Sequence, residues 1–211
     1  MATESTVTNS TGRRVVWRWR VVDIVVASVL GVASGIIFWA WGLAWAPLSA
    51  ALAFSPGLAG LLAGGWLFAG VLGGLVIRKP GAALFTEAVA ALVSMIVGTQ
   101  WGYTTIIWGL LEGLGAELIF ALFLYRVWGF WIAPLAGAGA GLVVGLLDTT
   151  LTSYAALDAG AKAIYIVSAV VSGAIVGALS WFAVHGLART GVLSRFASGR
   201  TSAPGEDSAA A

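Results

Sequence analysis

Four acidic residues lie inside stretches of the chain that are otherwise apolar. They are Glu87, Glu112, Glu117 and Asp148. Placing an aspartate at the centre of a membrane helix costs about 2.5–3.5 kcal/mol even on low scales. A simple membrane anchor does not need acids that carry this cost. We therefore expect these carboxylates to line a polar site within a helical bundle, facing a ligand, an ion or a partner.

Aromatic and amide side chains accompany these acids. Trp108 precedes Glu112 by four residues, so both lie on one face of a helix. Gln100 and Trp101 lie in the connection before that helix, and Tyr154 follows the next acid-bearing stretch. Carboxylates beside aromatic faces suit a flat, cationic ligand, through stacking and cation–π attraction.

Each of these residues also has an explanation that involves no ligand. Tryptophan and tyrosine are enriched at both membrane surfaces, which would account for Trp101 and Trp108. A buried acid such as Glu87 would be protonated and bonded to a neighbouring helix, and the same holds for the other two glutamates. Asp148 would be the solvated end of its helix. The residues alone leave the structural and the ligand-binding interpretations open.

The composition is that of an integral membrane protein. Of 211 residues, 60% are hydrophobic and 9% are charged, whereas soluble domains carry about 25% charged residues. The chain has no cysteine, a single histidine (His185), no phosphate-binding G-x-x-x-x-G-K-[ST] loop and no H-E-x-x-H motif. We expect neither an enzyme nor a resident cofactor or metal, and the net charge of +2 is too small to indicate nucleic acid.

Six stretches are apolar and long enough to cross a bilayer core of about 30 Å, which needs roughly 20 residues. They are 22–44, 57–77, 81–98, 104–124, 130–151 and 163–188. The sequence predicts an all-α integral membrane protein with a six-transmembrane-helix bundle. We assign residues 21–190 to this bundle, which forms a substrate-binding domain around the expected polar site. Residues 1–20 form a basic, partly disordered cytoplasmic tail, and residues 191–211 form a disordered cytoplasmic tail.

The basic residues predict the orientation of the bundle. Ten of the eleven lysines and arginines lie before the first stretch, after the sixth, or in the second and fourth connections, and only Lys162 lies on the other side. By the positive-inside rule both termini are cytoplasmic, in a multi-pass protein of the bacterial plasma membrane. With a rise of 1.5 Å per residue, Glu87 and Glu117 lie at a similar depth, and Glu112 and Asp148 lie nearer the outer side. This arrangement predicts an outward-facing pocket with a polar floor.

Two stripes of small residues at four-residue spacing predict close helix packing. One stripe is Ala27, Gly31 and Gly35, and the other is Gly137, Gly141 and Gly145. Packing inside the bundle is one explanation, and docking of another membrane subunit is the alternative.

Several strings of the sequence resemble a known family. They are 77–84 followed by Thr86 and Glu87, 113–117 with Phe120, 190–193, and 23–25 with a helix end at Phe38 and Trp39. These strings resemble the YkoE family, and the resemblance runs from Trp19 to Leu193. The family comprises the substrate-binding (S) components of energy-coupling-factor (ECF) vitamin importers.

The resemblance implies a six-helix bundle that captures thiamine or its hydroxymethylpyrimidine (HMP) precursor from outside the cell. It also implies two partners, a transmembrane coupling subunit and an ABC-type ATPase, which supply the energy. Glu87 and Glu117 match acids within the family strings, and Asp148 and Tyr154 match the end of the fifth helix. The resemblance implies glutamine at position 112, so Glu112 is a departure that favours a more cationic ligand.

The combined hypothesis is an S component with an acid- and aromatic-lined pocket. Its predicted ligand-binding residues are Glu87, Gln100, Trp101, Trp108, Glu112, Glu117, Asp148 and Tyr154. Under this hypothesis Glu117→Ala weakens binding severely. The first alternative is a stand-alone, cation-coupled secondary carrier in which Glu87 and Glu117 relay protons. The second is an assembly subunit whose acids pair with basic groups of a partner.

Overall fold

The computed structural model describes residues 18–191, 193 and 196–200, and all regular secondary structure within them is helical. The elements are α1 (Val21–Ala51), η1 (Pro56–Ala63), α2 (Gly64–Ile77), α3 (Ala82–Val97), α4 (Thr104–Leu122), α5 (Ile132–Leu151), η2 (Ser153–Ala156), α6 (Ala159–Arg189) and α7 (Ala197–Arg200). The predicted tails fall largely on residues 1–17 and 201–211, which lie outside the described residues.

The predicted all-helical bundle is confirmed, with one helix shorter than expected. Each predicted span corresponds to one helix, except that η1 and α2 together form the second span. Within the described residues, five segments are long and apolar enough to cross a membrane, whereas α3 has 16 residues. At 1.5 Å per residue α3 is about 24 Å long, less than a bilayer core of about 30 Å.

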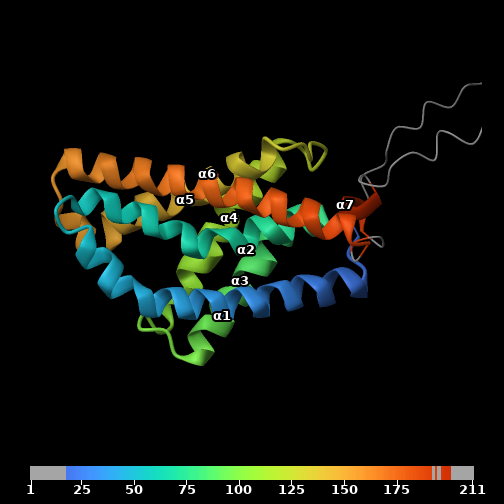
Figure 1. Ribbon diagram of the computed structural model, residues 1–211, viewed down its shortest axis with the longest axis horizontal. Helices are drawn as coiled ribbons and strands as arrows, with labels where there is room; N and C mark the ends of the chain where they lie inside the picture. The colour runs from blue at the N-terminus through green and yellow to red at the C-terminus, as the bar shows by residue number, and fades with distance from the viewer. Residues whose placement is uncertain (1–17, 192, 194–195, 201–211) are drawn as a thin grey trace, which may run out of the picture.

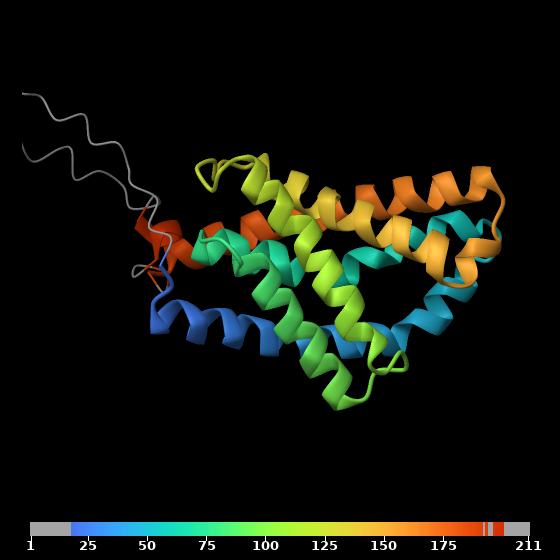
Figure 2. The same ribbon diagram turned by 180° about the vertical axis from the view of Figure 1, so that it is seen from behind.

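The long helices run along the length of the molecule, and two helices cross it. Figure 1 shows α1, α2 and α6 extending along the long axis, and Figure 2 shows α3 and α4 running diagonally across them. The start of α1 and the short α7 lie at one end of the bundle, and the turn between α5 and α6 lies at the other (Figure 1). We call these the terminal end and the far end.

Both small-residue stripes pack inside the bundle. Gly31 and Gly35 of α1 face α3, where an added Cβ would meet the side chains of Val89 and Val93. In α5, a Cβ on Gly137 would overlap the carbonyl group of Gly173 in α6. Small residues allow this close approach of the backbones. Of the two explanations for the stripes, the structure therefore favours internal packing.

A buried ion pair ties α1 to the α2–α3 connection at the terminal end. Asp23 is fully buried, and its carboxylate lies 2.5 Å from Lys79 Nζ and 3.0 Å from an Arg20 guanidinium nitrogen. The indole of Trp19 donates a hydrogen bond to the carbonyl oxygen of Pro80 (2.9 Å). A buried carboxylate needs such charged partners to offset the loss of solvation. These contacts fix the terminal ends of α1 and α3 relative to each other.

Candidate ligand-binding site

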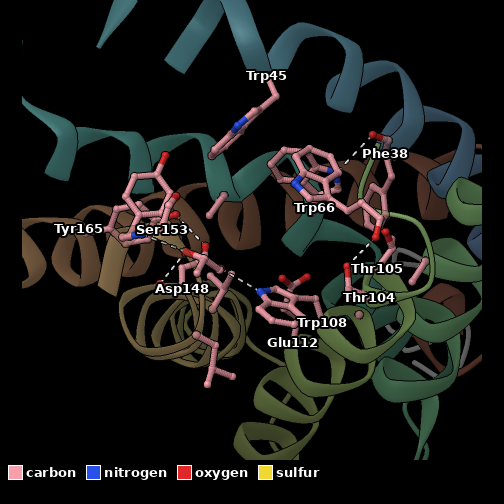
Figure 3. A pocket seen from close by; sticks show the side chains of 18 residues that line it. Phe38, Trp45, Trp66, Thr104, Thr105, Trp108, Glu112, Asp148, Ser153 and Tyr165 are labelled. Carbon is pink, nitrogen blue, oxygen red and sulfur yellow. Dashed lines mark hydrogen bonds between the residues drawn. The ribbon is translucent and has the colours of Figure 1, made fainter. Parts of the chain in front are cut away.

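A cavity of about 430 Å³ opens near the far end of the bundle. This volume falls in the range of about 300–1,000 Å³ that is typical of small-molecule sites. Figure 3 shows side chains of several helices pointing into the cavity. The lining residues are Phe38, Trp45, Ala63, Trp66, Ala91, Trp101, Thr104, Thr105, Trp108, Gly109, Glu112, Val144, Asp148, Leu151, Thr152, Ser153, Tyr154 and Tyr165.

The cavity contains two carboxylates in different states of hydrogen bonding. Asp148 Oδ1 accepts a hydrogen bond from the Trp108 indole (2.9 Å), and Asp148 Oδ2 accepts one from the Tyr165 hydroxyl (2.7 Å). Glu112 is 6% exposed and accepts no hydrogen bond from the part of the chain that the structure describes. The protein therefore holds Asp148 in place and leaves Glu112 available to a ligand.

Aromatic rings form two walls of the cavity. On one side Trp66 lies edge-on to Trp101, with ring centroids 5.3 Å apart, and Trp45 lies 5.4 Å from Trp66. On the other side the rings of Tyr154 and Tyr165 lie 4.5 Å apart. Burial, and secondarily the nearby carboxylate of Asp148, raise the pKa of Tyr154, so its hydroxyl stays neutral. The site offers faces for a flat ring and at least one neutral hydroxyl beside it.

Five of the predicted site residues line this cavity together. They are Trp101, Trp108, Glu112, Asp148 and Tyr154. That they contact a ligand stays a prediction. Sequence reasoning missed Trp66 and Tyr165 as cavity residues. The sequence position of Tyr165 could have indicated this. Asp148 lies shortly before the α5–α6 connection and Tyr165 shortly after it, so the helical hairpin brings the two side chains together.

Glu87 and Gln100 do not line the cavity. Glu87 is 1% exposed, and its Oε2 accepts a hydrogen bond from the backbone N–H of Gly70 (2.5 Å). The other oxygen of Glu87 has no partner among the described residues. Gln100 donates a hydrogen bond from Nε2 to the carbonyl oxygen of Gly42 (3.3 Å). The contacts of Glu87 join α3 to α2, and those of Gln100 join the α3–α4 connection to α1.

Glu117 also lies outside the cavity, at the terminal end of α3. Its carboxylate accepts hydrogen bonds from the backbone N–H groups of Gly81 (2.6 Å), Ala83 (2.8 Å) and Leu84 (3.2 Å), and from the Tyr125 hydroxyl (2.7 Å). Burial and this last hydrogen bond raise the pKa of Tyr125, so its hydroxyl remains a neutral donor. The first N–H groups of a helix lack partners within the helix, and a carboxylate there is stabilising. The position of Glu117 indicates a helix cap, and the ligand contact expected from the sequence stays a prediction.

We expect Glu117→Ala to destabilise the fold strongly. The substitution removes the acceptor of three backbone N–H groups and one hydroxyl, and each buried donor left without a partner costs about 1–3 kcal/mol. The control is Asp158→Ala, which removes an exposed cap that accepts from Gly160 and Ala161 at the start of α6. Loss of such a cap costs about 1 kcal/mol. Thermal unfolding of the detergent-purified variants measures both effects. A Glu117→Ala protein as stable as wild type would contradict the capping role.

Known proteins match most of this chain. Residues 22–143 match the family model described as the permease component of an ABC-type cobalt transport system. A Bacillus subtilis (strain 168) protein designated YkoE, named provisionally as an HMP/thiamine permease, is 33% identical over 186 residues, which cover 86% of this chain and 91% of that protein. A crystal structure described as an S-component of an ECF transporter superposes with a TM-score of 0.80 at 32% identity, covering 87% of this chain and 93% of that one.

Proposed function

The chain belongs to the YkoE family of S components of ECF transporters, and on that premise we propose that its cavity captures thiamine or HMP from outside the cell. As a member of this family it is a multi-pass membrane transport protein and a non-catalytic subunit. The observation that carries the proposal is the aromatic cavity with a carboxylate, Glu112, that has no hydrogen-bond donor from the described residues.

The cavity matches the chemistry of these ligands. Thiamine joins a cationic thiazolium ring to an aminopyrimidine, and HMP carries the aminopyrimidine alone. Trp66, Trp101 and Trp108 supply ring faces and edges against which a heteroaromatic ring packs. The carboxylate of Glu112 accepts a hydrogen bond from the amine or faces the positive ring. Tyr154 and the lining threonines Thr104, Thr105 and Thr152 complete the polar contacts.

The proposed orientation places both termini in the cytoplasm and the cavity toward the outside. The start of α1 and α7 lie together at the terminal end (Figure 1). Ten of the eleven basic residues belong to the tails, to the end of α6 or to the connections on that side, which supports a cytoplasmic terminal end. The far end, where the cavity lies, then faces the ligand before uptake.

The proposed partners are a transmembrane coupling subunit and an ABC-type ATPase. The sequence has no phosphate-binding G-x-x-x-x-G-K-[ST] loop, and the S-component relative is by its description part of an ECF transporter. The protein therefore binds ligand on its own and needs the partners to release the ligand inside the cell.

Uptake by whole cells tests the role of the partners. Cells that neither make nor import thiamine are given this chain alone, the chain with the coupling subunit and ATPase, or the same set with an inactive ATPase. We expect radiolabelled thiamine or HMP to accumulate only with the active ATPase.

Uptake by the chain alone would contradict the proposal. If that uptake also stopped when the proton gradient was collapsed, the protein would be a cation-coupled secondary carrier. A third outcome is that the purified chain binds ligand but no combination of subunits gives uptake. That result would support ligand capture and contradict the proposed partners.

A further inference from the structure

Glu112 is the acid of the cavity whose charge the protein leaves unmatched. Among the residues that the structure describes, the lining contains two acids and no lysine, arginine or histidine. Asp148 has a donor on each oxygen, from Trp108 and from Tyr165. Glu112 receives no hydrogen bond from the described residues, although only 6% of its surface is exposed. A buried carboxylate in this situation is costly unless something else brings positive charge or hydrogen-bond donors.

Other acids near Glu112 increase this need for positive charge. Asp148 on α5 lines the same cavity as Glu112. The backbone of α4 passes close to Glu87, because a Cβ on Gly113 would contact the Glu87 side chain. Two acids from two helices thus line the cavity, and a third, Glu87, is buried behind α4. Low-dielectric walls around charges of one sign concentrate their field on a ligand.

We propose that Glu112 is the specificity-determining residue of this site and that it selects a positively charged heteroaromatic ring over a neutral ring of the same shape. The inference rests on the proposed function and deepens it, because it makes thiamine rather than HMP the preferred ligand. Asp148 has a different task. It is a positioning residue that fixes the Trp108 and Tyr165 rings from α4 and α6, and it acts on neutral and charged ligands alike.

Two ligands that differ in charge but not in shape test this assignment. One is thiamine, and the other is its analogue in which a neutral thiophene replaces the thiazolium ring. Their dissociation constants are measured by calorimetry on the purified full chain and on the variants Glu112→Gln, Glu112→Asp and Asp148→Asn. The readout is the ratio of the two constants, which a general loss of structure would not change selectively.

We expect wild type to prefer thiamine by about 10- to 100-fold, as for the loss of one close contact between opposite charges. Glu112→Gln should bring the ratio close to one, and Glu112→Asp should keep a preference for thiamine because it keeps the charge. Asp148→Asn should weaken both ligands by a similar factor, since the amide nitrogen cannot accept the hydrogen bond that a carboxylate oxygen accepts.

Two results would overturn the inference while leaving the proposed function standing. One is a wild-type protein that binds both ligands equally well. The other is a Glu112→Gln protein that keeps the full preference for thiamine. If wild type bound neither these ligands nor HMP, the proposed function itself would fail, and this inference would fail with it.

Discussion

Val144→Trp is expected to reduce thiamine or HMP affinity by at least about 100-fold, which corresponds to about 2.7 kcal/mol. Val144 is 4% exposed and lies on α5, where its side chain lines the cavity. An indole at this position occupies the space between the aromatic walls that the ligand would fill. The expected loss arises from exclusion of the ligand, because the substitution leaves both carboxylates of the cavity unchanged.

The matched control is Leu142→Trp on the same helix. Leu142 is 46% exposed and does not line the cavity, so an indole there points away from the ligand. Thr105→Phe fills the cavity from α4 and serves as an independent second variant. Both cavity variants should lose binding in calorimetric titration while they remain monodisperse in detergent. Retained affinity in both would place the ligand elsewhere in the molecule.

Gly137→Ala is expected to prevent normal packing of α5 on α6. An added Cβ would overlap the carbonyl oxygen of Gly173, and a Cβ on Gly173 would overlap that of Gly137. The two helices must separate to make room. Overpacking of a well-packed interior costs typically about 1–3 kcal/mol, and here the obstacle is backbone rather than a flexible side chain. The expected result is a large fall in the unfolding temperature of the purified protein.

Gly186→Ala in α6 is the control for this change. A Cβ at Gly186 meets no atom of the described residues within 4 Å, and alanine favours helix by about 1 kcal/mol over glycine. This variant should be at least as stable as wild type, and Gly173→Ala should resemble Gly137→Ala. Equal unfolding temperatures for Gly137→Ala and Gly186→Ala would refute the close α5–α6 contact.

The spans could be predicted from sequence because apolar length alone determines where a helix crosses a membrane. The pattern of small residues likewise predicted close packing, although not which helices would meet. Gly31 faces α3 and Gly137 faces α6 because of the tertiary arrangement, which residue spacing does not encode. The predicted stretch 81–98 matches α3 to within one residue at each end, and the helix ends at Gly98, where the backbone adopts a positive φ of 112°.

The acids show what the sequence alone does not distinguish at a site. A buried carboxylate has the same cost whether a ligand or a helix end supplies its hydrogen-bond donors. Glu117 is five residues from Glu112 on α4, yet it caps α3 whereas Glu112 faces the cavity. Only the position of the neighbouring helix distinguishes these two outcomes. The pairing of Trp108 with Glu112 on one face was a sound local prediction, since both line the cavity.

The most direct test of the central claim is a calorimetric titration of the purified wild-type chain, without partners, with thiamine and then with HMP. Co²⁺ is titrated in parallel, because the matching family model is described by cobalt transport. We predict saturable, submicromolar binding of thiamine or HMP at one site per chain. Folded protein that binds neither thiamine nor HMP would contradict the claim, and binding of Co²⁺ alone would identify a different cargo.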